Sequence, residues 1–545
     1  MTGIPVTSEP PTGRRRDIPD VLGLLMLAFD GETIPAWLER RLVEAPPAGF
    51  TLFRFHNVRS PDQVRELTYA LQAAAPPDLP FLVAADQEGG QFQALGEGPT
   101  QFAGAMALGA AGDETLAERV GRATGTELAA MGVNVCYAPV ADVAMTTLNP
   151  ALGIREFGSD ASAVAGLVAA TVRGIRSAGV AATVKHFPGK GAVETDTHHA
   201  LGVVGHDRQR LEAVELVPFR AGIEAGVELV MSGHFAVPAL TGADDVPATL
   251  AGEIMNDLLR GELGFSGVTI TDALDMKALD QGPNQVLDIL AAIRAGVDLL
   301  LLATDPVGRE RVTAGLRYAA RRRLLDDEAV GRALGRVTAL RRRLARPGRA
   351  DRPPIAVVGC AEHRALSQDV AARSITLVRN DDGLLPIELM PGSRVLAIMP
   401  RPLDLTPADT SSTVEPGLAA AMRAVHPDVD ELVVEFEPDD ATIAAARRLA
   451  LGADVVVVGT IAALPGSGQA RLVEALLDSG RPIVTVALRT PWDLLSYPMA
   501  RTHLCTYSVL PDSLAALAAV LVGRAPAEGR LPVAIPGLHP VGHGR

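Results

Sequence analysis

The clearest indication of the fold is the stretch Ala161-Ser-Ala-Val-Ala-Gly-Leu-Val-Ala-Ala-Thr-Val-Arg-Gly-Ile-Arg-Ser-Ala178-Gly179-Val-Ala-Ala-Thr-Val-Lys185. Its first part has the residue spacing of a helix, and its last six residues form an apolar run typical of a buried strand. Gly179 between them suits the left-handed conformation that commonly ends a helix. The same junction occurs six times, at Ala48-Gly49, Met131-Gly132, Ala178-Gly179, Ala225-Gly226, Ser266-Gly267 and Ala295-Gly296. Repeated helix-to-strand junctions predict a parallel sheet with helical crossovers.

Eight apolar runs in about 300 residues suit a (β/α)8 TIM barrel, whose active site lies where the strands end. The runs are Val21–Phe29, Phe50–Phe55, Pro80–Ala85, Val133–Val140, Val180–Lys185, Val227–Ser232, Val268–Thr271 and Val297–Ala303. An open, doubly wound parallel sheet is the structural alternative. Polar residues lie at or just beyond the run ends, at Asp30, His56, Asp86, Asp142, His186, His234, Asp272 and Asp305.

A second, smaller α/β domain is expected after an Arg- and Pro-rich linker. Its predicted strands are Ile355–Val358, Val395–Met399, Leu432–Phe436, Val455–Val458 and Ile483–Ala487. Gly466-Ser-Gly468 is only weak support for nucleotide binding, because no phosphate-binding lysine follows it. The predicted divisions are an N-terminal extension (1–16), the barrel domain (17–344), the linker (345–354), the second domain (355–536) and a tail (537–545).

Composition argues against several classes of partner. The net charge is −14 and the basic residues form only short triplets, so nucleic acid is not an expected partner. No apolar run reaches the roughly 18 residues of a membrane span. The three cysteines form no disulfide framework, which favours a cytoplasmic location. Arg14–Arg16 precede a short apolar stretch, but Asp17, Pro19 and Asp20 interrupt it, so we do not expect an export signal.

Lysine is rare in this chain, and two of its three lysines fall in one loop. The loop, Lys185-His-Phe-Pro-Gly-Lys-Gly-Ala-Val-Glu-Thr-Asp-Thr-His-His199, follows the fifth run, and Gly189 and Gly191 are expected to leave it mobile. Asp196 is two residues from His198, so the carboxylate can favour the imidazolium and provide an acid near neutral pH. A polar surface loop or a His/Asp metal site are the alternatives from the residues alone.

Other strand-end residues have both functional and ordinary interpretations. Asp272 ends the seventh run and is expected to point into the barrel mouth, whereas Asp275 is interpreted as a helix N-cap. Asp86, in Asp86-Gln-Glu-Gly-Gly90, suits close approach of a polyhydroxylated ligand, or forms an acidic turn. Arg155 offers a planar donor or is merely solvated. His234 is as compatible with a structural role as with a functional one.

These motifs resemble glycoside hydrolase family 3, and within it the bacterial β-N-acetylhexosaminidases, including those of cell-wall recycling. The matching stretches are Asp86–Gly90, Met106–Gly109, Ala138–Asp142, Asn149–Gly158, Lys185–Gly191, Asp196-Thr-His198, Ile270–Met276, Ser374–Asn380, Leu384–Pro386 and Gly529–Val533. The resemblance therefore covers nearly the whole chain, and it implies a TIM barrel followed by an α/β-sandwich domain.

The resemblance implies a retaining double displacement without a metal or organic cofactor. Asp272 would be the nucleophile, and His198 the acid/base that Asp196 orients. The residues that would hold the sugar and its N-acetyl group are Asp86, Arg155, Lys185 and His186. The expected substrate is a small-molecule glycoside with a terminal N-acetylglucosamine, because the aromatic content of 4% offers few stacking platforms for long polysaccharides.

Two positions depart from the family pattern. Ala94 stands where the family usually has an arginine, and Lys190 stands where it usually has a histidine. An ammonium at position 190 favours an acidic or differently substituted aglycone. A family 3 β-glucosidase, an N-acetylglucosaminide phosphorylase and a sugar-binding protein on the same barrel remain the alternative functions.

Overall fold

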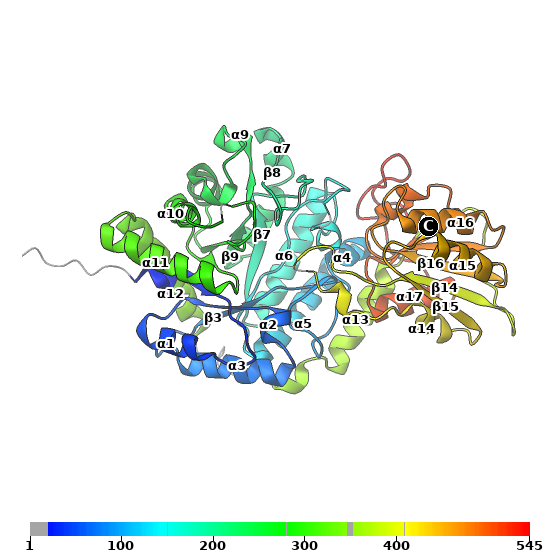
Figure 1. Ribbon diagram of the computed structural model, residues 1–545, viewed down its shortest axis with the longest axis horizontal. Helices are drawn as coiled ribbons and strands as arrows, with labels where there is room; N and C mark the ends of the chain where they lie inside the picture. Colours follow the sequence, from blue (N-terminus) through cyan, green and yellow to red (C-terminus); the bar gives the residue numbers. More distant parts are fainter. Residues whose placement is uncertain (1–19, 150, 280, 346–351, 408, 545) are drawn as a thin grey trace, which may run out of the picture.

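The computed structural model describes residues 20–149, 151–279, 281–345, 352–407 and 409–544, and it contains two domains side by side (Figure 1). The expected N-terminal extension lies outside the described residues, as does most of the expected linker. Among the residues that are described, no helix is both long enough and apolar enough to cross a lipid bilayer.

The first domain is built on an eight-stranded sheet in which spatial order follows chain order. All strand pairs are parallel, and the bridge between Ile270 and Leu299 joins the last strands to each other, which closes the barrel. This arrangement excludes the doubly wound alternative. The strands are β1 (Leu25–Leu27), β2 (Gly49–Leu52), β3 (Leu82–Ala85), β6 (Val135–Cys136), β7 (Ala181–Phe187), β9 (Leu229–Ser232), β11 (Val268–Thr271) and β12 (Leu300–Leu301).

Helices cover the outside of the barrel, and short strand pairs extend from its carboxyl end. The short strands are β4 (Gln87–Gly89), β5 (Phe92–Gln93), β8 (Gly202–Val203) and β10 (Phe235–Ala236). The α-helices are α1 (Ala36–Glu44), α2 (Arg54–Asn57), α3 (Pro61–Ala73), α4 (Ala105–Ala111), α5 (Glu114–Met131), α6 (Ala161–Ser177), α7 (Arg208–Ala213), α8 (Val217–Glu224), α9 (Pro238–Thr241), α10 (Gln285–Ala295), α11 (Pro306–Arg322) and α12 (Asp327–Leu344). The short 3₁₀ turns are η1 (Val21–Leu24), η2 (Gly153–Arg155) and η3 (Ala248–Leu250), and η4 (Glu253–Glu262) is a π-helix.

Several barrel strands are shorter than the apolar runs that predicted them. The run from Val21 begins as the turn η1, because the Asp20 carboxylate accepts a hydrogen bond from the Leu22 amide and starts a helical turn. The run from Phe50 ends at Leu52, and α2 begins two residues later. Apolar character therefore does not mark the length of a strand: Val21 is buried in a turn, and Phe55 is 63% exposed in α2.

The glycines of the six repeated junctions serve two different purposes. Four of them adopt the positive φ of a helix end, namely Gly132, Gly179, Gly226 and Gly296. Gly49 instead lies where a Cβ would be 2.0 Å from the Leu82 carbonyl oxygen, so it permits close approach of neighbouring strands. The helix-end interpretation was therefore wrong for Gly49, and also for Gly267, although both precede strands as expected.

The second domain has a six-stranded mixed sheet in the order β13-β18-β17-β16-β14-β15. Its strands are β13 (Thr376–Asn380), β14 (Val395–Pro400), β15 (Val429–Val434), β16 (Val455–Thr460), β17 (Ile483–Ala487) and β18 (Thr502–Cys505). Its helices are α13 (Ala361–Ser374), α14 (Leu418–Arg423), α15 (Asp440–Ala450), α16 (Gly468–Leu477) and α17 (Pro511–Leu521), with turns η5 (Ile355–Val357), η6 (Ser411–Thr413) and η7 (Pro491–Ser496).

The second domain departs from the sequence prediction at both ends. Ile355–Val358 is not a strand, because Pro354 starts the turn η5, which packs against α5 of the barrel. The edge strand β13 and its antiparallel partner β18 were not predicted. Residues 537–544, expected as a tail, fold back on the domain: the Gly542 amide donates to the Leu531 carbonyl, and His543 Nε2 lies 2.8 Å from the Val378 carbonyl oxygen.

Candidate active site

Several of the polar side chains expected at the barrel mouth are brought together at the carboxyl ends of β3, β7 and β11 and in the connection after β6. Asp86 follows β3, Lys185 and His186 end β7, and Asp272 follows β11. Arg155 belongs to η2 in the long connection after β6. Because the strands of the barrel are parallel, their carboxyl ends point to one face, and side chains far apart in sequence meet there.

The centre of the site is a buried cluster of two carboxylates and two cations. Lys185 Nζ lies 2.5 Å from Asp86 Oδ1 and 2.5 Å from Glu88 Oε1. Arg155 binds Glu88 through two parallel contacts, Nε to Oε2 and Nη2 to Oε1, each 2.9 Å long. Its guanidinium also lies over the Phe92 ring, 4.1 Å from the ring centroid. The interpretation of Arg155 as merely solvated is therefore wrong.

The two carboxylates of this cluster differ in their pKa. Burial opposes ionisation of Glu88, but Arg155 and Lys185 outweigh it and lower the pKa to about 2. Burial dominates at Asp86 and raises its pKa in spite of Lys185, which is also shared with Glu88. The side chain of Asp86 is 25% exposed, whereas that of Glu88 is 6% exposed. Asp86 is thus the carboxyl of the pair that faces the open mouth.

His186 is held by Asp142, a strand-end residue to which the sequence analysis assigned no role. Its Nδ1 lies 2.7 Å from Asp142 Oδ2, so an Nδ1–H donates to that carboxylate. Burial, followed by the charges of Lys190, Arg155 and Lys185, lowers the pKa of His186 well below its ordinary value. A neutral ring with Nδ1–H leaves Nε2 as an acceptor, and Nε2 lies 4.0 Å from Asp272 Oδ2.

Asp272 is an ionised carboxylate at the edge of this cluster. The Ala273 amide donates to its Oδ1 over 2.8 Å, and the Asp272 amide donates to the Ser232 carbonyl of β9. Burial raises the pKa of Asp272, but the charges of Lys190, His234 and His198 outweigh this effect and hold the pKa below its ordinary value. Its side chain is 17% exposed, so the charge is accessible from the mouth.

Lys190 is the buried cation that acts most strongly on Asp272. Its backbone amide donates to Asp142 Oδ1 over 2.7 Å, which ties the loop after β7 to the loop after β6. Burial lowers the pKa of its ammonium, and Asp272 is the first of the charges that oppose this effect. Lys190, which departs from the family pattern, is therefore close enough to act on Asp272, the nucleophile expected from the resemblance.

Asp196 and His198 form a pair on the same loop. His198 Nδ1 lies 2.7 Å from Asp196 Oδ1, and the His198 amide donates to the same oxygen. Burial disfavours the charged form of Asp196, but these hydrogen bonds outweigh it and lower the pKa of its carboxyl. The Lys277 amide donates to the His198 carbonyl, which joins this loop to the one that follows Asp272.

Two neighbouring residues have structural roles. Asp275 lies in a turn, and α10 begins ten residues later, so its interpretation as an N-cap was wrong. His234 is buried at the end of β9, with Nδ1 2.9 Å from the Thr249 hydroxyl and Nε2 3.2 Å from the Ala273 carbonyl oxygen. It therefore supports the backbone that carries Asp272.

Three residues of the site were not assigned from the sequence. Glu88 belongs to the motif Asp86–Gly90, and its position two residues after Asp86 is a usable signal for a second carboxylate in the site. Asp142 was noted only as a strand-end residue. Phe92, which packs under Arg155, has no signal in the sequence beyond its proximity to the motif.

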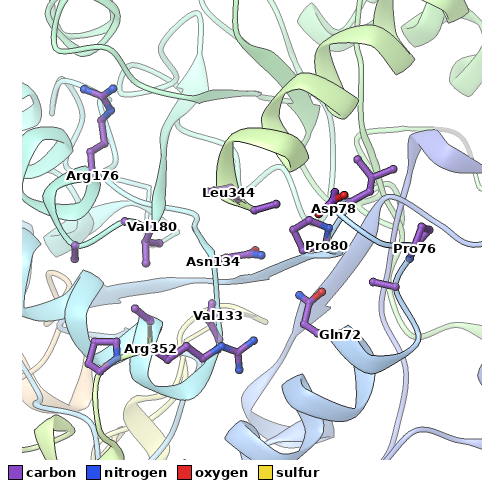
Figure 2. Close-up of a pocket in the computed structure, with 18 of the residues that line it drawn as sticks. Gln72, Pro76, Asp78, Pro80, Val133, Asn134, Arg176, Val180, Leu344 and Arg352 are labelled. Carbon is purple, nitrogen blue, oxygen red and sulfur yellow. The ribbon is translucent and has the colours of Figure 1, made fainter. Parts of the chain in front are cut away.

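A groove at the opposite end of the barrel is a separate feature (Figure 2). It has a volume of about 620 Å³ and is lined by residues that precede the strands, including Pro80, Asn134 and Val180. Two of its polar side chains already have protein partners: Asn134 bonds the Phe81 and Val83 backbone, and Arg176 bonds Glu228. The candidate active site is therefore the cluster at the carboxyl ends.

The site as a whole combines three chemical capacities. Asp272 supplies an ionised carboxylate, and the Asp196–His198 pair supplies an imidazole that can exchange a proton. The cluster around Glu88 presents cations and a carboxyl in fixed positions, which suits hydroxyl and amide groups of a sugar. In the part of the chain that the structure describes, no group of three or more His, Cys, Asp and Glu residues is arranged to hold a metal ion.

Family models match both domains of this chain. The glycosyl hydrolase family 3 N-terminal domain matches residues 32–340, and the family 3 C-terminal domain matches residues 375–539. The chain belongs to glycoside hydrolase family 3. The resemblance noted from the motifs is confirmed, and the protein is a glycoside hydrolase rather than only a sugar-binding barrel.

Relatives of this family 3 protein match it over most of its length. Beta-hexosaminidase A from Pseudoalteromonas piscicida is 31% identical, over 92% of this chain and 92% of the relative. The Beta-N-acetylglucosaminidase/beta-glucosidase of Cellulomonas fimi is 32% identical, over 84% of each chain. A family 3 beta-N-acetylglucosaminidase structure from Paenibacillus covers 95% of this chain and 99% of its own, with 34% identity and a TM-score of 0.88. The expected barrel and sandwich are confirmed.

Proposed function

We propose that this family 3 glycoside hydrolase is a retaining exo-β-N-acetylhexosaminidase that removes terminal N-acetylglucosamine from small glycoconjugates. The observation that carries the proposal is the pairing of His198 with Asp196 on the loop after β7, opposite the ionised Asp272. The names of the relatives from Pseudoalteromonas and Paenibacillus support the same activity.

In the first step Asp272 attacks the anomeric carbon while the bond to the departing oxygen breaks. His198 gives its proton to that oxygen from Nε2, because Nδ1 is occupied by the hydrogen bond to Asp196. The product of this step is a glycosyl ester of Asp272 and a free aglycone. In the second step His198 takes a proton from water, the oxygen attacks the anomeric carbon, and the Asp272 carboxylate leaves.

The buried cluster would hold the sugar during both steps. Asp86 faces the mouth and suits two neighbouring hydroxyls, while Lys185 and Arg155 offer donors fixed by Glu88. His186 has its Nδ1–H committed to Asp142, and its acceptor Nε2, which Arg155 Nη2 contacts over 3.5 Å, would be shared with the sugar. These assignments make Asp86, Arg155, Lys185 and His186 substrate-binding residues.

A β-glucosidase activity is the second candidate function. The relative from Cellulomonas fimi, which matches 84% of this chain, carries both activities in its name. A beta-glucoside phosphorylase structure is only 24% identical, with a TM-score of 0.80, so it is evidence for the fold alone. We also infer from the cysteine usage that the protein acts in the cytoplasm, and from the family resemblance that its sugars are released from the cell wall. Cell fractionation with an antibody would test the location.

The deciding experiment compares p-nitrophenyl β-N-acetylglucosaminide with the β-glucoside, each with and without phosphate, for the wild type and Asp272→Ala. We expect turnover of the N-acetyl substrate that does not require phosphate and that falls on the order of 10⁴-fold in the variant. Turnover of the glucoside alone would replace the proposed specificity, and phosphate dependence would replace water as the acceptor. An unimpaired variant would remove Asp272 as the nucleophile.

A further inference from the structure

The β4–β5 hairpin carries the residues that fix the sugar-binding cations. Glu88 lies in β4, where it bonds both Arg155 and Lys185, and Phe92 lies in β5 under the Arg155 guanidinium. Any displacement of this hairpin would therefore move the cations of the site. The contacts that hold the hairpin in place therefore affect substrate binding as well as folding.

The turn of this hairpin is held from the second domain. Gln91 is 2% exposed, and its carbonyl oxygen accepts two hydrogen bonds from Thr410, one from the amide at 2.8 Å and one from the hydroxyl at 2.9 Å. The amide oxygen of the Gln91 side chain accepts a third hydrogen bond, from Arg489 Nη2. Thr410 precedes η6 and Arg489 follows β17, so both belong to the sheet domain.

Arg489 is itself fixed by a buried carboxylate. Its Nη1 donates to Asp409 Oδ2 over 2.9 Å, and both side chains are almost completely buried. The other oxygen of Asp409 accepts from the Ser411 amide and hydroxyl, at 2.9 and 2.6 Å. The guanidinium thus joins a rigid turn of the second domain to the hairpin, using a separate nitrogen for each partner. A lysine ammonium lacks this planar fork.

We propose that Arg489 and Thr410 are positioning residues for the active site: through Gln91 they hold the β4–β5 hairpin, and with it Glu88, Arg155 and Lys185, in the arrangement that binds the sugar. The inference rests on the proposed function for the role of these cations. It gives the second domain a part in substrate binding, exerted through the hairpin.

The test uses two conservative series in the full-length protein. Arg489→Lys keeps a positive charge for Asp409 but loses the fork, so the protein is expected to fold. Thr410→Val removes the hydroxyl hydrogen bond, whereas Thr410→Ser retains it. Arg373→Met is the matched control, because Arg373 also joins the two domains, through Asp113 at the start of α5, but does not contact the hairpin.

We expect Arg489→Lys to raise KM for the aryl N-acetylglucosaminide about tenfold with kcat within about twofold, as loss of one charge-assisted hydrogen bond predicts. Thr410→Val should raise KM less, and Thr410→Ser should restore it. Hydrogen exchange of the amides in residues 87–93 should accelerate in Arg489→Lys and Thr410→Val but not in Arg373→Met. Equal changes in the control would reduce the contact to a general brace between domains and overturn the proposal.

The exchange measurement separates this inference from the proposed function. If the wild type turns over neither substrate, the proposed activity fails, while hairpin exchange still decides whether Arg489 and Thr410 position Glu88. If the activity is found and the hairpin loosens without any change in KM, the link from hairpin to sugar binding is wrong although the hydrolase assignment stands.

Discussion

Two buried carboxyls at the mouth of the barrel have pKa values shifted in opposite directions, because their charged neighbours differ. Burial acts against the charged form of both Asp86 and Asp272. At Asp86 burial prevails and the pKa is raised, because Lys185 is shared with Glu88. At Asp272 three cationic or titratable neighbours prevail and the pKa is lowered. A lowered pKa keeps the proposed nucleophile ionised at neutral pH.

Replacement of Lys190 by methionine tests this electrostatic account. Without the ammonium, the pKa of Asp272 should rise, because the first of the charges that lower it is gone. The acid limb of kcat/KM requires ionised Asp272 in the free enzyme, so it should move to higher pH. Lys277→Met is the control, since Lys277 is exposed on the adjacent loop. If the acid limb of kcat/KM stays at its original pH in Lys190→Met, Lys190 does not lower the pKa of Asp272.

Replacement of His198 by alanine tests the assignment of the proton donor. Aryl glycosides with acidic leaving groups need little protonation, whereas alkyl glycosides need it fully. We therefore expect kcat/KM to fall on the order of 10²–10⁴-fold for poor leaving groups and far less for nitrophenol. The measurement is the dependence of kcat/KM on the leaving-group pKa, and an equal loss across the series would argue against proton donation.

At the scale of elements, the loop after β7 carries most of the proposed chemistry, and its glycines serve close packing. Gly191 lies where a Cβ would be 1.8 Å from the Val143 carbonyl oxygen, and Gly189 has φ of +112°. These contacts bring the loop against the connection after β6, where the Lys190 amide reaches Asp142. The sequence predicts mobility at these glycines, whereas the structure gives them a steric reason.

Gly191→Ala is therefore expected to disturb both stability and activity. The added methyl group must displace backbone, which costs about 1–3 kcal/mol for a tightly packed site. Gly205→Ala provides the control, because a Cβ there meets no atom within 4 Å. Urea denaturation and kcat/KM of the two variants check the prediction. Equal stability in both variants would mean that the loop accommodates the methyl group without cost.

At the scale of the whole molecule, the two domains are joined by a buried carboxylate as well as by the hairpin. Glu127 on α5 accepts hydrogen bonds from the Thr100 amide and hydroxyl within the barrel domain. Across the interface it accepts from the Gly359 amide at 3.0 Å and contacts His363 Nδ1 at 2.7 Å. One largely buried side chain therefore satisfies donors from both domains.

Removal of this carboxylate should destabilise the protein as a whole. Glu127→Ala would leave buried donors of both domains without a partner, and a loss of about 3–5 kcal/mol in the free energy of unfolding is expected. Glu118→Ala on the same helix removes only partly exposed ion pairs, so its cost should be about 0–1 kcal/mol. Chemical denaturation of both variants is the measurement, and similar costs would contradict the role of Glu127.

The sequence by itself favoured a parallel sheet with helical crossovers and a barrel over an open sheet, because eight apolar runs alternating with helices bury both faces of such a sheet. The bridge between Ile270 and Leu299 decided between the two. It also indicated which polar residues end the strands, and the family motifs suggested the roles that we propose for Asp272, His198 and Asp196. These features are encoded locally, as periodicity and short spacing. Strand ends were less well predicted, because an apolar residue can be buried in a turn, as Val21 is in η1, or only partly buried in one, as Ile355 is in η5.

Only the tertiary structure decided how the site residues share charge. Glu88 lies between Arg155 and Lys185, Asp142 holds His186, and Lys190 acts on Asp272. It also brought Thr410 and Arg489 to Gln91, more than 300 positions away in the chain. Such contacts depend on how separate elements pack against each other, and the direction of a pKa shift depends on the balance between burial and nearby charge. The spacing of residues along the chain predicts neither the packing of separate elements nor the direction of these pKa shifts.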